Sequence, residues 1–139
     1  PITIGRSFYM GVDPIMEQNN AIYREQSRLI QEFAEKSDCV IVGRSADYIL
    51  REKHPFRLFV YAEMEHKMER CKKRAPESEH FTDKELKRHI LDVDKRRARY
   101  YQFFTGQTWG DRLNYDLCIN TSNYDIKELV HAIAHLVEA

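Results

Sequence analysis

The chain has 139 residues, in which 22 lysines and arginines balance 22 aspartates and glutamates, and 42% of the residues are hydrophobic. This size is typical of one soluble domain, and no apolar run approaches the ~20 residues of a membrane-spanning helix. We find no secretory leader and only three widely spaced cysteines, so we expect a cytoplasmic protein without a disulfide framework or a metal site.

The net charge of zero hides an uneven distribution. Residues 66–100 hold 12 basic and 7 acidic side chains, whereas residues 1–65 hold 8 and 10, and residues 101–139 hold 2 and 5. A neutral chain argues against a protein that coats nucleic acid or membranes. We expect any anionic partner to meet the central segment.

Short apolar runs alternate with longer helical patterns along the chain. The predicted strands are residues 2–4, 39–42, 56–61 and 116–120, and the predicted helices are 14–36, 46–52, 63–74, 82–104 and a last one after residue 125. Capping boxes at Thr82-x-x-Glu85 and Ser122-x-x-Asp125 open the last two helices. The alternation predicts one α/β domain over residues 1–139 with a mainly parallel sheet.

Ligands of such sheets bind beyond the carboxyl ends of the strands. Two of the four predicted ends read Gly-Arg, at Gly5-Arg6 and Gly43-Arg44, and the others are Tyr61-Ala62 and Asn120-Thr121. Glycine permits close approach to the backbone, and arginine offers a fork of donors to phosphate oxygens. The strand ends therefore favour an anionic ligand.

The long helix carries one charged residue at an unexpected position. At 100° per residue, Arg97 falls on the same face as Leu86 and Ile90. It either points into a polar cavity or has a structural role, as a pair with Asp94 or with its stem packed and its charged head in solvent.

The preceding helix, whose inner face we expect at Met64, Met68, Cys71 and Ala75, carries a second basic pattern. Lys67, Arg70 and Arg74 lie along one side of it. These side chains are either a solvated face or, with the long helix, a basic hairpin suited to a polyphosphate.

Two other patterns favour structural roles more than chemistry. His131 and His135 are spaced i, i+4 but have no acidic or thiolate partner nearby in the sequence, so we expect a structural role. The aromatic residues between Tyr100 and Trp109 could stack a base, and core packing at a helix end explains them at least as well.

Four segments together resemble the cytidylate kinase-like family, relatives of cytidylate kinase among the P-loop nucleoside monophosphate kinases. They are VGRSADYIL at 42–50, RRARYY at 96–101, TGQTWGD at 105–111 and NYDLCIN at 114–120. The resemblance implies a three-layer P-loop kinase fold, with helices on both faces of the sheet and a helical lid at about residues 70–100. It also implies ATP as the donor, Mg²⁺ as the counter-ion and a nucleoside monophosphate such as CMP or dCMP as the acceptor.

The resemblance also implies roles for particular residues. The residues that would bind the acceptor are Arg44, Ser45 and Asp47. The residues that would act in phosphoryl transfer are Arg70, Asp94, Arg97 and Arg99. The residues that would bind the donor are Gly5, Arg6 and Lys67. Ser45 stands where true cytidylate kinases have Asp, so the sequence leaves the identity of the acceptor open, as it does the oligomeric state.

One departure from the family pattern concerns the phosphate loop. The family has a glycine-rich loop directly after the first strand, whereas here Arg6 is followed at once by Ser7, and no glycine-rich segment occurs elsewhere. We expect a missing segment between residues 6 and 7 of a longer, active kinase. The alternatives are a regulatory protein that binds nucleotides without catalysis and a nucleic-acid-binding module built on residues 66–100.

Overall fold

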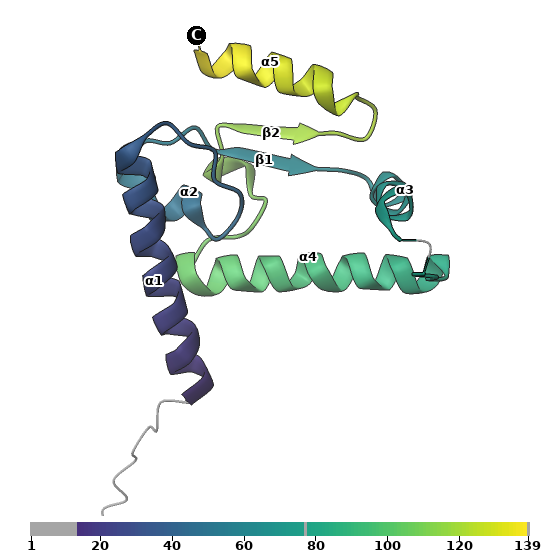
Figure 1. Ribbon diagram of the computed structural model, residues 1–139, viewed down its shortest axis with the longest axis horizontal. Helices are drawn as coiled ribbons and strands as arrows, with labels where there is room; N and C mark the ends of the chain where they lie inside the picture. The colour runs from purple at the N-terminus through teal and green to yellow at the C-terminus, as the bar shows by residue number, and fades with distance from the viewer. Residues whose placement is uncertain (1–13, 77, 139) are drawn as a thin grey trace, which may run out of the picture. The chain divides into compact units, whose positions relative to one another are not determined.

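A computed structural model describes residues 14–76 and 78–138, which form two compact units that divide between Leu50 and Arg51 (Figure 1). The predicted strand at residues 2–4, together with Gly5, Arg6 and the proposed gap after Arg6, lies outside the described residues. The described chain is of the α/β class, as the sequence predicts. Among the described residues, no helix combines the length and the apolar character needed to cross a bilayer.

The first unit is built around the long predicted helix. This helix, α1, runs over Pro14–Lys36, and a short helix, α2, follows over Ala46–Ile49. Ile30 of α1 is buried against Ala46 and Leu50, and Ala34, Ile41 and Ile49 are partly buried around them. A small apolar core therefore holds the segment after residue 42 against the carboxyl-terminal half of α1.

The apolar run at residues 39–42 does not form the strand that the sequence predicts. Within the described residues it has no strand partner, and Val40 and Val42 are 94% and 89% exposed. Cys39 is likewise exposed rather than packed as a small hydrophobe. Apolar composition favours a strand only where a neighbouring strand accepts its backbone hydrogen bonds.

The second unit contains two parallel strands that come from distant parts of the chain. Strand β1 is Leu58–Tyr61 and strand β2 is Leu117–Asn120, with Leu58 opposite Leu117 and Tyr61 opposite Asn120. Phe59 packs against Trp109 and Tyr115, with ring centroids 5.2 and 4.9 Å apart. Trp109 therefore belongs to the packing beneath the strands and not to a surface for a stacked base.

The amino end of the strand pair is closed by an ion pair. The backbone N–H of Arg57 donates to Asp116 Oδ2 at 2.7 Å, and its guanidinium donates to Oδ2 and Oδ1 at 3.2 and 3.0 Å. The Arg57 carbonyl in turn accepts from the backbone N–H groups of Asp116 and Leu117. These side-chain and backbone hydrogen bonds from Arg57 hold the pKa of the Asp116 carboxyl below its usual range.

Two helices follow β1 and pack on each other. Helix α3 spans Met64–Arg74, and helix α4 spans Asp83–Thr105. The capping box predicted at Thr82 and Glu85 is confirmed, with both reciprocal hydrogen bonds present. Cys71, which the sequence places on the inner face of α3, is exposed instead.

The position predicted for Arg97 is wrong. Its side chain is 64% exposed, whereas that of Asp94 is 24% exposed. The buried residues of α4 form two groups, Leu86 with Ile90 and Tyr101 with Thr105, and Arg97 lies in the more exposed turn between them. Helical spacing gives the direction of a side chain but not whether another element covers that direction.

The last helix, α5, spans Ile126–Glu138 and begins differently from the prediction. Asp125, not Ser122, caps it, since Asp125 Oδ1 accepts from the backbone N–H groups of Lys127 and Glu128 at 2.8 and 3.2 Å. The predicted apolar stripe is present but largely uncovered, with Ile126, Val130 and Leu136 about half exposed.

We predict that Asp116→Asn lowers the free energy of unfolding at pH 7 by roughly 1 kcal/mol, because it removes the negative charge that pairs with Arg57. The partial exposure of this pair to solvent keeps the loss small. The folded-state pKa of Asp116 is depressed, so this stabilisation is complete above the ordinary carboxyl pKa near 3.8 and is lost as the pH falls through the folded value. Urea unfolding of both proteins at several pH values measures the difference.

Asp92→Asn serves as the control, because Asp92 is an exposed carboxylate on the surface of α4. A difference between Asp116→Asn and the unsubstituted protein that stays constant down to pH 2 would contradict the assignment.

Candidate functional site

The carboxyl ends of the two strands meet a group of polar side chains from α3 and from the segment after β2. The backbone N–H and the hydroxyl of Thr121 both donate to the Tyr61 carbonyl, at 2.9 and 3.1 Å. The Ser122 hydroxyl accepts from the backbone N–H of Glu63 at 2.8 Å and donates to Asn120 Oδ1 at 2.7 Å. Thr121 and Ser122 are 3% and 8% exposed, so this end of the sheet is buried and fully hydrogen-bonded at these positions.

Arg70 joins α3 to this strand end. Its Nη1 donates to Thr121 Oγ1 at 2.8 Å, and its Nη2 donates to the Thr121 carbonyl at 2.5 Å. Figure 1 shows both strands running side by side toward α3, which brings this arginine to their ends. The sequence singles out Arg70 and Asn120-Thr121 separately, but nothing in it pairs residues 51 positions apart.

Arg70 also lines a hollow of about 400 Å³ together with Lys73, Arg74 and Ile126. Three basic side chains and no acidic one surround this space, so its electrostatic potential favours a polyanion. Arg70 is partly buried and bound to Thr121, whereas Lys73 and Arg74 are exposed, and Lys73 is not among the residues that the sequence singles out. Lys73 also pairs with Glu69 one turn earlier, at 2.7 Å.

Lys67 and Asp94 connect α3 to α4 by a second ion pair. Lys67 Nζ lies 2.6 Å from Asp94 Oδ2, and the two side chains are 30% and 24% exposed. Arg97 Nη1 lies 3.5 Å from the other oxygen, Asp94 Oδ1. Asp94 thus neutralises a lysine from one helix and stands beside an arginine that extends into solvent.

Arg97 and Arg99 do not share a face of α4. Two residues along a helix correspond to a rotation of about 200°, so the two side chains leave α4 in nearly opposite directions. Arg99 is exposed. A ligand on one side of α4 meets only one of these two arginines.

In the first unit, Gly43, Arg44 and Ser45 form a turn with positive φ angles of 75°, 57° and 56°. Each non-glycine residue in this region costs about 1 kcal/mol. Ser45 is only 4% exposed, and among the described residues its hydroxyl has no hydrogen-bond partner, which adds a desolvation cost. Arg44 is exposed and Asp47 is partly buried. Strain and an unpartnered buried hydroxyl thus coincide at one short motif.

Comparison with known proteins finds one matching family and similar solved structures. A family model described as "Cytidylate kinase-like family" matches residues 2–123. A crystal structure of an uncharacterized protein from Eubacterium ventriosum ATCC 27560 is similar, with 27% identity and a TM-score of 0.77, over 87% of this chain and 74% of that one. Among curated proteins, none matches the chain.

We predict that a double-mutant cycle of Lys67→Met and Asp94→Asn gives a coupling free energy of about 0.5–1 kcal/mol, because the pair is partly shielded from water. The cycle of Lys72→Met and Asp83→Asn is the matched control, since that pair has the same 2.6 Å separation and also joins α3 to the start of α4, but is 50% and 74% exposed. Urea unfolding of the four proteins in each cycle gives the two values. Equal coupling in the two cycles would contradict a special role for Asp94.

Proposed function

Since the chain belongs to the cytidylate kinase-like family, we propose that it transfers the γ-phosphoryl group of ATP to the phosphate of a nucleoside monophosphate. The observation that carries this proposal is the basic hollow at the carboxyl end of the parallel strands, next to the pair formed by Lys67 and Asp94. In α/β sheets this end is where ligands bind. The nearby hairpin of α3 and α4 would serve as the lid of a three-layer P-loop kinase fold.

In the proposed reaction, the bond between the γ-phosphorus and the β,γ-bridging oxygen breaks, and an oxygen of the acceptor phosphate forms the new bond. The products are ADP and a nucleoside diphosphate. The acceptor oxygen is already ionised at neutral pH, so the reaction needs no general base. What it needs is positive charge around the transferred group.

Arg70 and Arg97 would supply this charge. Arg70 is fixed at the strand ends by Thr121, so it offers a preorganised cation beside the donor phosphates. The contact of Arg97 with Asp94 is long and exposed, so a phosphate group can compete for its guanidinium. Asp94 would hold Arg97 near this position until the nucleotide binds, and Lys67 would hold Asp94. Arg99 would reach phosphates only from the other side of α4.

ATP and Mg²⁺ fit the residues that surround the hollow. A nucleotide triphosphate carries several negative charges, which the three basic side chains would balance. Mg²⁺ bound with the nucleotide would neutralise charge on the phosphates and would be held largely by phosphate oxygens and water. The donor's phosphate chain also needs backbone N–H groups, which we assign to a glycine-rich segment between residues 6 and 7 together with Gly5 and Arg6.

The turn at Gly43, Arg44 and Ser45 would bind the acceptor. An acceptor that donates to or accepts from the Ser45 hydroxyl would satisfy the group that has no partner in the structure. Arg44 would pair with the acceptor phosphate, and Asp47 would lie at the edge of the same site. Because serine is neutral, the acceptor here need not carry the exocyclic amino group that a carboxylate would favour.

A second candidate is a protein that binds nucleotides without transferring phosphate. The absence of a glycine-rich segment from the printed sequence favours it. The mass of the intact protein separates the possibilities, because a segment missing from the sequence adds several kDa to 16.6 kDa. Binding of ATP in calorimetry, without ADP release in the presence of any nucleoside monophosphate, would favour the second candidate.

We predict that Arg97→Ala lowers kcat on the order of 10²-fold in the intact protein, because a cation is lost from the transition state. The assay follows ADP release with the best acceptor from a panel of nucleoside monophosphates. Arg88→Ala, which removes another exposed arginine from α4, is expected to leave kcat unchanged. Unchanged kcat in Arg97→Ala would remove Arg97 from the proposed mechanism.

We predict that Ser45→Ala raises the KM for the acceptor about tenfold, the equivalent of one hydrogen bond, and changes the KM for ATP little. The midpoint of urea unfolding is expected to stay constant or to rise, since the substitution removes a buried hydroxyl that has no partner. Ser37→Ala, at an exposed serine of the same unit, is the control. A loss of stability without a change in the KM for the acceptor would contradict the proposed role.

A further inference from the structure

One side of α4 carries a row of basic residues that is separate from the hollow at the strand ends. The row consists of Lys84, Arg88, Lys95 and Arg99, and all four are exposed. At 100° per residue they fall within about 60° of one another, opposite the buried Leu86 and Ile90. Figure 1 shows the two strands and α3 together on one side of this helix. We call the row of four the outer basic face of α4.

The stability of the helix does not account for these four cations. In the part of the chain that the structure describes, none of them forms an ion pair, not even with Asp92, which borders the row. Exposed cations of α1 are arranged differently. Arg28 lies 2.6 Å from Glu25, and Lys36 lies 2.6 Å from a carboxylate one turn earlier. The outer basic face instead places like charges one helical turn apart twice, and such pairs weaken a helix.

Two exposed apolar side chains lie among the cations of this face. Leu91 is 51% exposed in the middle of the row, and Phe103 is 55% exposed one turn beyond Arg99. Phe104 packs edge-on against the Phe103 ring, with the ring centroids 4.9 Å apart. An exposed ring that is held in place beside cations is the kind of surface on which a nucleic-acid base stacks.

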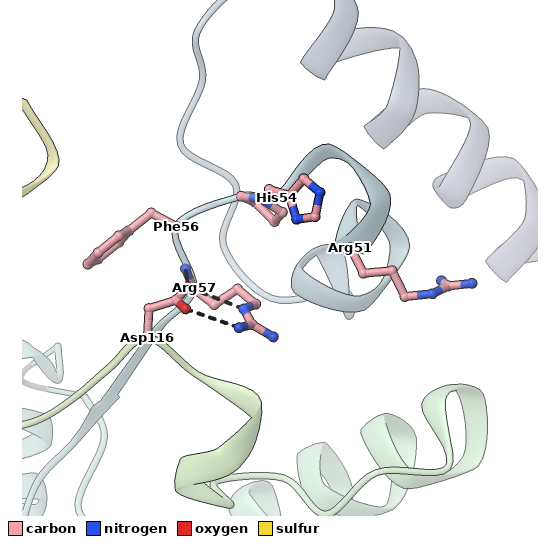
Figure 2. A pocket seen from close by; sticks show the side chains of 6 residues that line it. Arg51, His54, Phe56, Arg57 and Asp116 are labelled. Atoms are coloured by element: carbon pink, nitrogen blue, oxygen red, sulfur yellow. Dashed lines mark hydrogen bonds and ion pairs between the residues drawn. The ribbon is translucent and has the colours of Figure 1, made fainter.

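The hollow at the amino end of the strands does not gather its cations in this way. Arg51, His54 and Arg57 contribute to its lining (Figure 2). The guanidinium of Arg57 is paired with Asp116 at 3.0 Å. Figure 2 shows the Arg51 side chain pointing away from His54 and Arg57. The positive groups at this end of the strands therefore do not converge on one anion, whereas those of α4 form a continuous row.

We propose that the outer basic face of α4 binds a single-stranded nucleic acid. From Lys84 to Arg99 the helix rises roughly 22 Å, a length that about six phosphates of one strand span. Phosphates pair with the cations of the row, and a base stacks on Phe103. A membrane fits this face less well, because a helix in a membrane interface needs a continuous apolar face, and the exposed apolar side chains here are those of Leu91 and Phe103.

This surface is independent of the proposed kinase function. The hollow that would hold nucleotides is lined by residues of α3 and by Ile126, and none of its lining residues lies on α4. Arg97, which would act in phosphoryl transfer, leaves α4 in nearly the opposite direction from Arg99. Separate variants can therefore test the two surfaces.

The test is the fluorescence anisotropy of a labelled oligouridylate and a labelled oligothymidylate of about 12 nucleotides, titrated with the intact protein at several salt concentrations. Four phosphate contacts predict a slope of log K against log salt of about −3. In the double variant Arg88→Ala/Lys95→Ala we expect binding on the order of tenfold weaker at about 0.1 M salt and a slope that is smaller by about 1.4. The two oligonucleotides distinguish RNA from DNA as the partner.

The matched control is Arg28→Ala/Lys36→Ala, which removes the same charge from an exposed helix whose cations are paired. We expect this control to bind both oligonucleotides as the unsubstituted protein does. We expect Arg88→Ala/Lys95→Ala to keep its midpoint of thermal unfolding or to raise it, because like charges are removed from one face.

Phe103→Ala separates base stacking from general attraction between charges. We expect binding about tenfold weaker with an unchanged salt slope, because a stacked base is lost and every phosphate contact remains. Phe33→Ala is the matched control, since Phe33 is 56% exposed on α1, and we expect it to leave the binding unchanged.

The proposal is overturned if Arg88→Ala/Lys95→Ala or Phe103→Ala binds the oligonucleotides as tightly as the unsubstituted protein. It is also overturned if polyglutamate or phosphatidylserine vesicles bind more tightly than either oligonucleotide, since an acidic polypeptide or a membrane would then be the partner. Displacement of the oligonucleotide by saturating ATP would place it in the hollow at the strand ends and would overturn the proposal as well. Loss of kinase turnover leaves these readings unaffected.

Discussion

The second unit depends on the pairing of two short strands, and an arginine closes that pairing at each end. Two paired strands of four residues each bury little apolar surface, and such a pair is only marginally stable by itself. At the amino end Arg57 binds Asp116 through its backbone and its guanidinium, and at the carboxyl end Arg70 binds Thr121 through a hydroxyl and a carbonyl. These contacts join positions 59 and 51 residues apart, so they fix the register that places every other group at the two ends.

The elements of this unit could be predicted from the sequence more readily than their burial. Period, capping box and apolar content located α3, α4 and both strands within a few residues, because those signals are local. These local signals do not predict that Arg97 and Cys71 are exposed. A helical wheel assumes that one face is covered along its whole length, whereas α4 is buried in two separate groups of residues. The partly buried side of α4 also carries a charged residue, Asp94, whose partner Lys67 comes from α3.

Pairing between distant segments explains the other differences between sequence and structure. Cys39–Val42 has the composition of a buried strand, but a strand requires a neighbour, and composition does not say whether the neighbour is in place. Ser122 has the spacing of a helix cap, yet its hydroxyl is taken by Glu63 and Asn120, so Asp125 caps α5 instead. For the same reason only part of the candidate site could be predicted: the sequence singles out the basic residues of α3 and the strand end at Asn120-Thr121, but not the contact that joins Arg70 to Thr121.

The strained residues of the two units follow a common rule. Arg44, Ser45 and His54 are the non-glycine residues with positive φ in the described chain, and each lies in a turn that also offers a charged or unpartnered polar group. Glycine would adopt these φ angles at lower cost, so stability alone does not account for the side chains present. A ligand that binds the folded turn and not the unfolded chain would repay part of the strain through mass action.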